Sequence, residues 1–293
     1  MNKEELKALV AQALREAEGG AAETVTPAAP TVPGGGDILE DLAAADLRRQ
    51  YLVDNPAHEQ AFLDLKAKTP ARVGIGRAGA RYKTATMLRF RADHAAAQDS
   101  VFSHVADDFA EKNGLVQVQT KCRDKDEYLT RPDLGRRFDE ENQKRIRETC
   151  GQGPKVVLAI GDGLSAAAVE ANAMACAEAV RQGLEAKGIQ LGKALSIRYC
   201  RVGASDHIGE LTGADLVCLL VGERPGLVTA ESLSAYITYR PRIGVPESAR
   251  TVVSNIHRQG TPAKEAGAQI AALIPQMLAR QCSGVAFRRG AGA

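Results

Sequence analysis

The sequence lacks long apolar runs and has no excess of charge of one sign. Its longest apolar stretches, such as Leu216–Val221, have the length of a strand and fall far short of the ~20 residues that cross a bilayer. The N-terminus has no continuous apolar segment of the kind a secretory signal needs. Lys and Arg number 38 against 36 Asp and Glu, giving a net charge of +2. We therefore expect a cytoplasmic protein with neither a membrane nor a nucleic acid as its partner.

Motifs for metal binding and for standard catalysis are also lacking. The six cysteines show no C-x-x-C pair and no Cys/His ligand spacing, which argues against a disulfide framework and a zinc site. The five histidines are dispersed, and no G-x-S-x-G, P-loop or H-E-x-x-H motif occurs. The stretch SDHIGE at 205–210 carries reactive side chains, but a histidine at a strand-to-helix turn is more often a capping or surface residue. We therefore assign no catalytic residue and no metal ligand.

The first 36 residues are expected to form a tethered helix. Apolar residues recur at helical spacing within residues 3–18, namely Leu6, Leu9, Val10, Ala13 and Leu14, which predicts an amphipathic helix. The Ala/Pro/Gly stretch that follows is typical of a flexible linker. Such a helix either docks onto another surface or is a frayed end without function.

Two further regions follow, 37–150 and 151–293. The first has apolar residues three and four positions apart and is expected to be mostly helical, with one strand at 115–120. In the second, helices at 164–187 and 262–281 alternate with strands at 155–160, 194–200, 214–221, 234–239 and 250–256. Continuous apolar strands joined by helices indicate a parallel sheet covered on both faces. We expect an α/β fold, with a Rossmann-like parallel sheet behind a helical N-terminal region.

One glycine turn raises the question of a bound dinucleotide. Gly161, Gly163 and Ala166 match the G-x-G-x-x-A spacing of a dinucleotide-binding turn. Asp162 would place a negative charge against the pyrophosphate. The next predicted strand runs into Arg201 where NAD sites have an acid for the ribose, which leaves NADP open. The turn therefore either binds a dinucleotide or is a structural element.

A second glycine turn, Gly74, Gly76 and Gly79, is flanked by arginines at 72, 77 and 81. Arginine offers a planar fork of donors, so this loop can wrap an anion or a carboxylate-bearing partner. A solvated basic loop before a helix fits the composition equally well.

Four stretches together resemble the small subunit of ethanolamine ammonia-lyase. They are YLTRPDLGRRF at 128–138, VGERPGLVTAESLSAY at 221–236, SNIH at 254–257 followed by GTP at 260–262, and GRAGAR at 76–81. The resemblance implies an adenosylcobalamin-dependent enzyme of large and small subunits, usually six of each. In this family a barrel-shaped large subunit holds ethanolamine, and cobalamin lies between it and a Rossmann-like small subunit. The N-terminal helix resembles the segment that directs this subunit into the bacterial microcompartment.

The resemblance also implies three contacts to cobalamin. The family's contact positions fall on Val202 in CRVG, Glu223 in VGERPG and Val252 in TVVSN. Related chains can have cysteine at the position of Val252. A contact through the backbone tolerates this change, whereas a contact through the side chain does not.

The lower ligand of cobalt is expected to come from the cofactor itself. Cobalamin proteins that replace it carry D-x-H-x-x-G, but Asp206 and His207 are adjacent and lack that spacing. Dimethylbenzimidazole therefore stays on cobalt, as the resemblance also implies, and the turn at Gly161 is a structural element. Two alternatives are an NAD(P)-dependent oxidoreductase and a non-catalytic microcompartment scaffold protein.

Overall fold

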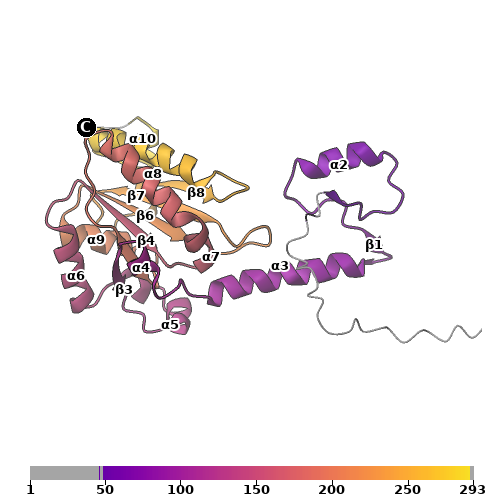
Figure 1. Ribbon diagram of the computed structural model, residues 1–293, viewed down its shortest axis with the longest axis horizontal. Helices are drawn as coiled ribbons and strands as arrows, with labels where there is room; N and C mark the ends of the chain where they lie inside the picture. Colours follow the sequence, from indigo (N-terminus) through magenta and orange to yellow (C-terminus); the bar gives the residue numbers. More distant parts are fainter. Residues whose placement is uncertain (1–45, 47–48, 291–293) are drawn as a thin grey trace, which may run out of the picture. The chain divides into compact units, whose positions relative to one another are not determined.

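The computed structural model describes residue 46 and residues 49–290 (Figure 1). The amphipathic helix and linker expected over residues 1–36 lie outside the described residues. No helix within the described ranges has both the length and the apolar character that crossing a membrane requires. The expected domain boundaries at residues 36 and 150 stay a prediction.

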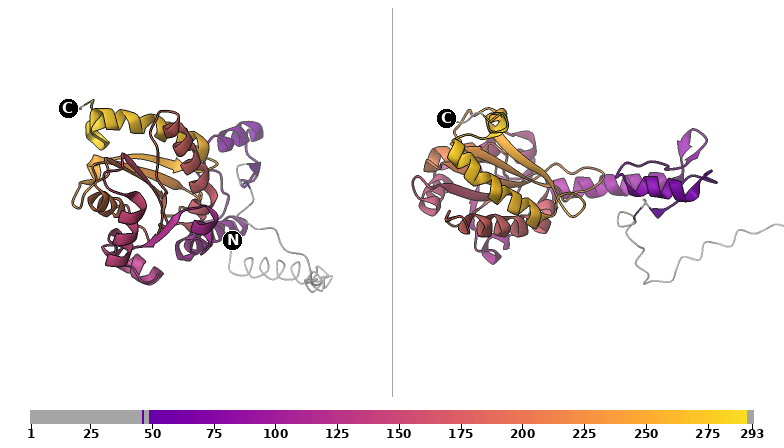
Figure 2. Two further views of the ribbon diagram at one scale, coloured as in Figure 1. Left: turned by 60° about the vertical axis from the view of Figure 1, so that its left-hand side comes forward. Right: turned by 90° about the horizontal axis from the view of Figure 1, so that it is seen from above.

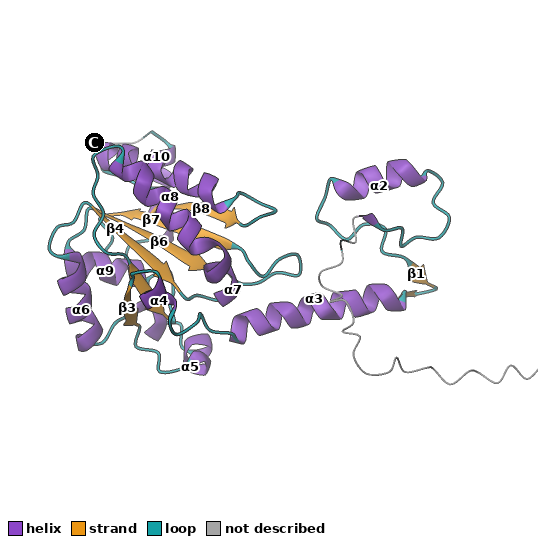
Figure 3. Ribbon diagram, in the orientation of Figure 1, coloured by secondary structure: helices purple, strands orange, loops and turns teal. Residues whose placement is uncertain are grey.

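Six strands form a mixed sheet in the order β3, β5, β4, β6, β7, β8 (Figure 3). Their bounds are Val116–Gln119 for β3, Val156–Gly161 for β4, Leu195–Arg198 for β5, Leu216–Gly222 for β6, Leu233–Tyr239 for β7 and Arg250–Ile256 for β8. Every strand expected from the sequence is present. The expectation of an α/β fold with a largely parallel sheet is therefore confirmed.

The last two strands differ from the parallel arrangement expected. Strands β3, β5, β4 and β6 are parallel, whereas β7 runs antiparallel to β6, and β8 runs antiparallel to β7. A parallel connection needs a crossover of about a dozen residues or more, usually a helix. The described connections 223–232 and 240–249 contain no α-helix. The chain therefore reverses direction at each of them.

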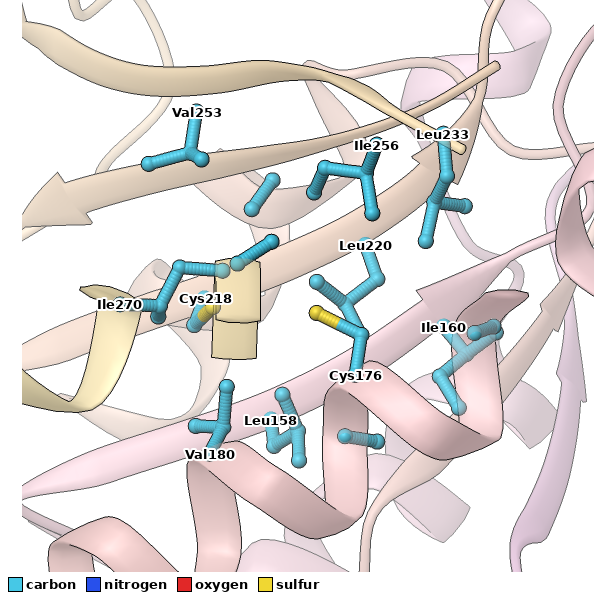
Figure 4. Close-up of a cluster of buried hydrophobic side chains, with 14 of the residues drawn as sticks. Leu158, Ile160, Cys176, Val180, Cys218, Leu220, Leu233, Val253, Ile256 and Ile270 are labelled. Carbon is cyan, nitrogen blue, oxygen red and sulfur yellow. The ribbon is translucent and has the colours of Figure 1, made fainter. Parts of the chain in front are cut away.

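Helices cover both faces of the sheet because the central strands are apolar on both sides. The covering helices are α8 (Met174–Glu185) and α10 (Ala263–Arg280) on one face, side by side in Figure 2, and α6 (Glu140–Cys150) and α9 (Ala204–Thr212) on the other. Along β6, Cys218 and Leu220 belong to the cluster under α8 and α10 (Figure 4). Val217 and Leu219 belong to the cluster under α6 and α9.

The remaining elements precede, connect or follow these strands along the chain. They are α2 (Glu59–Ala67), β1 (Arg77–Ala78), β2 (Arg81–Tyr82), α3 (Thr84–Phe102), α4 (Phe109–Lys112), α5 (Lys125–Thr130), η2 (Leu134–Arg136), α7 (Ala166–Ala168), η3 (Val169–Ala173), η4 (Glu247–Ala249) and α11 (Gly284–Arg288). The helix expected at 164–187 consists of α7, the π-helical turn η3 and α8. The helix expected at 262–281 is α10.

Candidate functional site

The glycine turn at the end of β4 is packed against the end of β6. A Cβ atom on Gly163 would lie 2.5 Å from the carbonyl oxygen of Gly222, and one on Gly222 would lie 2.1 Å from the carbonyl oxygen of Ser165. Both glycines are therefore required by the close approach of two backbones. The turn therefore has a structural role, because it lets the segment after β4 pack against the end of β6.

Asp162, within the same turn, is a buried carboxyl group in an ion pair. The residue is 6% exposed, and its Oδ1 lies 4.0 Å from Nζ of the buried Lys125. Within the described residues, no side chain donates a hydrogen bond to this carboxyl group. Burial raises the pKa of Asp162, with the Lys125 charge and the backbone N–H of Val105 acting in the opposite direction. Burial also lowers the pKa of Lys125.

The three residues implied as cofactor contacts come from three separate elements on the α9 side of the sheet. Val202 lies in the turn between β5 and α9 and packs against the same cluster as Tyr236. Glu223 follows directly after β6. Val252 lies inside β8, where it pairs with Tyr236 of β7. The structure thus joins Glu223 and Val252 through Tyr236, while Val202 shares only the underlying cluster.

A hydrogen bond from Tyr236 fixes the carboxylate of Glu223. The hydroxyl of Tyr236 donates to Oε1 of Glu223 at 2.7 Å. Among the described residues, no ion pair involves Glu223, and it forms no salt bridge with the neighbouring Arg224. Val252 is 45% exposed on the same face. These three side chains form a surface with a carboxylate, a phenol and an apolar group, which we call the β6–β8 surface.

The loop 223–232, which begins with Glu223, is held by polar contacts at its far end. The backbone N–H of Glu223 donates to the carbonyl oxygen of Ser232 at 3.0 Å. Ser165 donates through its hydroxyl to the carbonyl oxygen of Ala230, and Asn172 donates through Nδ2 to that of Glu231 at 2.9 Å. Asn172 belongs to the π-helical turn η3, a kind of turn found frequently at functional sites.

Sequence reasoning missed both Tyr236 and Asn172. A weak signal existed for Tyr236, because residues 234, 236 and 238 share the less apolar face of β7. That alternation predicts the face but not the partner. Asn172 had no signal in a pattern that predicted an uninterrupted α-helix.

The stretch 128–138 supports the turn that carries Val202. The hydroxyl of Tyr128 donates to the carbonyl oxygen of Cys200 at 3.1 Å. The guanidinium of Arg201 lies 4.2 Å from the centre of the Tyr128 ring, and its Nη2 donates to the carbonyl oxygen of Tyr128 at 2.8 Å. The backbone N–H of Arg201 donates to the carbonyl oxygen of Gly135 at 2.9 Å. This stretch therefore fixes the backbone beside Val202.

The reactive side chains of SDHIGE are used inside the fold. Asp206 accepts two hydrogen bonds from the guanidinium of the buried Arg250, at 2.7 and 2.8 Å. Nδ1 of His207 accepts a hydrogen bond from the backbone of Phe138 at 3.1 Å, and the two rings stack. Burial lowers the pKa of His207. Within the described part of the chain, no three His, Cys, Asp or Glu side chains gather as a metal site.

The arginine-flanked turn at 76–81 forms the two-stranded hairpin β1–β2. Arg77 and Arg81 are exposed, and the Arg77 guanidinium lies 4.7 Å from the centre of the Tyr82 ring. The expectation that this loop wraps an anionic partner stays a prediction.

Comparisons with known proteins place this chain in a family. Residues 59–288 match the family model described as "Ethanolamine ammonia-lyase light chain (EutC)". The ethanolamine ammonia-lyase small subunit of Clostridioides difficile is 54% identical over 290 residues, which cover 97% of this chain and 99% of that protein. The small subunit of Clostridium perfringens is 59% identical over 249 residues, covering 85% and 84%.

Both kinds of match indicate the same class of protein, the light chain of an enzyme with more than one kind of subunit. The chain belongs to the ethanolamine ammonia-lyase light-chain family. The resemblance found in the sequence is thereby confirmed.

Replacing Asp162 by asparagine should change how stability depends on pH. Because its folded-state pKa is raised, the folded wild type binds a proton that the unfolded chain has released. Wild-type stability should therefore fall, relative to Asp162→Asn, as pH rises from about 4 towards 7. Chemical unfolding of both proteins across this range measures the difference. The control Asp126→Asn removes an exposed carboxyl group instead of a buried one. Parallel curves for Asp162→Asn would contradict the assignment.

Proposed function

We propose that this chain is the small subunit of an adenosylcobalamin-dependent ethanolamine ammonia-lyase. Together with a large subunit it would convert ethanolamine to acetaldehyde and ammonia by a radical mechanism. Membership of the light-chain family supports this proposal. The structural observation that carries it is the β6–β8 surface, at the side of a Rossmann-like sheet where Glu223 leaves the carboxyl end of β6.

The residues of the β6–β8 surface fit cobalamin. The rim of cobalamin carries amide side chains, and a carboxylate accepts their N–H groups in hydrogen bonds. Oε1 of Glu223 receives the Tyr236 hydroxyl, and no other side chain within the described ranges donates to this carboxylate. Oε2 is therefore left for an amide of the cofactor, and the exposed Val252 offers an apolar contact beside it. When bound, adenosylcobalamin supplies the adenosyl radical that abstracts hydrogen from the substrate.

This chain's own contribution is to bind and orient the cofactor. Val202, Glu223 and Val252 are the proposed contacts. We assign the groups that bind ethanolamine to the large subunit, because Asp206 and His207 are engaged within the fold.

The purified chain alone should have no lyase activity. Co-expression with the large subunit, followed by addition of adenosylcobalamin and ethanolamine, should give acetaldehyde, and the assembly should contain six copies of each chain. The control replaces adenosylcobalamin by hydroxocobalamin, which has no adenosyl group. Acetaldehyde production by the isolated chain would contradict the assignment of the ethanolamine-binding groups to the large subunit. An assembled complex without turnover would favour a scaffold role.

Removing the carboxylate of Glu223 should weaken cofactor binding. A hydrogen bond to a charged group contributes about 1.5–3 kcal/mol, so Glu223→Ala should raise the apparent cofactor constant by about ten- to a hundredfold. Glu223→Gln keeps an acceptor without the charge and should have a smaller effect. Turnover at saturating cofactor should be largely retained in both. The matched control is Glu231→Ala, an exposed acid in the same loop. Unchanged constants in an intact assembly would remove Glu223 from the site.

We propose that the enzyme lies in the cytoplasm, within a bacterial microcompartment, and contacts the shell through the helix that the sequence predicts within residues 3–18. The support is the amphipathic pattern and linker of residues 1–36. Deleting residues 1–20 should leave turnover of the assembled enzyme nearly unchanged and reduce the fraction that co-purifies with shells. A truncated enzyme that loses most turnover but still localises normally would refute this role.

A further inference from the structure

Tyr236 occupies a position that links the two neighbouring cofactor contacts without being one of the residues the family resemblance assigns. It lies on β7 between β6, from which Glu223 emerges, and β8, where it faces Val252 in the register of the sheet. Its ring packs against the apolar cluster under α9. Its hydroxyl reaches the carboxylate of Glu223 at 2.7 Å.

The hydroxyl of Tyr236 keeps its proton at neutral pH and can therefore donate a hydrogen bond. Burial, the hydrogen bond to Glu223 and the negative charge of Glu223 all raise its pKa. A carboxylate that accepts this bond through one oxygen has its other oxygen held in a defined direction. A long acidic side chain at the start of a loop otherwise loses rotamer freedom when a ligand binds it.

We propose that Tyr236 is a positioning residue for the corrinoid cofactor, which presents Oε2 of Glu223 to an amide of the corrin rim. The inference rests on the proposed function of the β6–β8 surface. Tyr236 acts through Glu223, so its contribution depends on the presence of that carboxylate.

The strand itself offers a matched control for this role. Tyr239 also lies on β7, but it is three residues further on and on the opposite face of the strand. Its ring contacts Arg240, with the guanidinium 5.4 Å from the ring centre. Tyr239→Phe therefore removes a hydroxyl from the same strand without touching Glu223.

The experiment is a double-mutant cycle on the assembled complex with the large subunit. The complex is titrated with adenosylcobalamin, and bound cofactor is measured by corrinoid absorbance after free cofactor is removed. The titration gives a dissociation constant for each of five proteins: wild type, Tyr236→Phe, Glu223→Ala, the double variant and Tyr239→Phe. Loss of one hydrogen bond predicts that Tyr236→Phe raises the constant about two- to tenfold. In the Glu223→Ala background the same change should have no further effect. The unfolding midpoint of Tyr236→Phe should match wild type, and so should the dissociation constant of the control Tyr239→Phe.

The outcomes separate this inference from the proposed function. If Glu223→Ala weakens binding but Tyr236→Phe does not, the positioning role is wrong and the proposed site stands. If the two effects add in the double variant, Tyr236 acts independently of Glu223 and the inference is overturned. If wild-type complex binds no corrinoid, or Glu223→Ala binds it as wild type does, the proposed cofactor site itself fails.

Discussion

The contact between the turn after β4 and the end of β6 determines where the candidate site lies. Gly163 and Gly222 let two backbones meet at a distance that any Cβ atom would prevent. Ser165, whose carbonyl oxygen belongs to this contact, also donates through its hydroxyl to the carbonyl oxygen of Ala230. Both ends of the loop that starts with Glu223 are therefore fixed by the same short segment. The turn has the G-x-G-x-x-A spacing of a dinucleotide-binding turn, but here it holds the ends of β4 and β6 together.

Much of the fold follows from the sequence because the central strands are apolar on both faces. Residues 155–160 and 214–221 predicted buried strands, and both lie in the middle of the sheet as β4 and β6. Strand direction did not follow, since apolar runs look alike in parallel and antiparallel neighbours. The connections after β6 and β7, which lack an α-helix, are the feature that decides direction.

The site was only partly predictable for a related reason. The resemblance gave the positions of Glu223 and Val252, but periodicity gives the face of a strand and not its register with a neighbour. The pairing of Tyr236 with both Leu219 and Val252 therefore required the structure. The irregular register between Leu233 and Ala235 shows how one local shift decides which side chains meet. Asn172 depended on a π-helical turn, which leaves no mark in an alanine-rich sequence.

The antiparallel return of β7 and β8 makes the sheet wider than its helical cover on one side. Helix α9 reaches β8 at the ion pair of Asp206 with Arg250, while Val252 and Ser254, further along the strand, are exposed. This part of the sheet face is therefore open to solvent. An exposed face shields only one side of a broad planar molecule from water. If the proposed cofactor binds here, a second polypeptide is needed to cover its other side, so subunit association and cofactor retention would occur together.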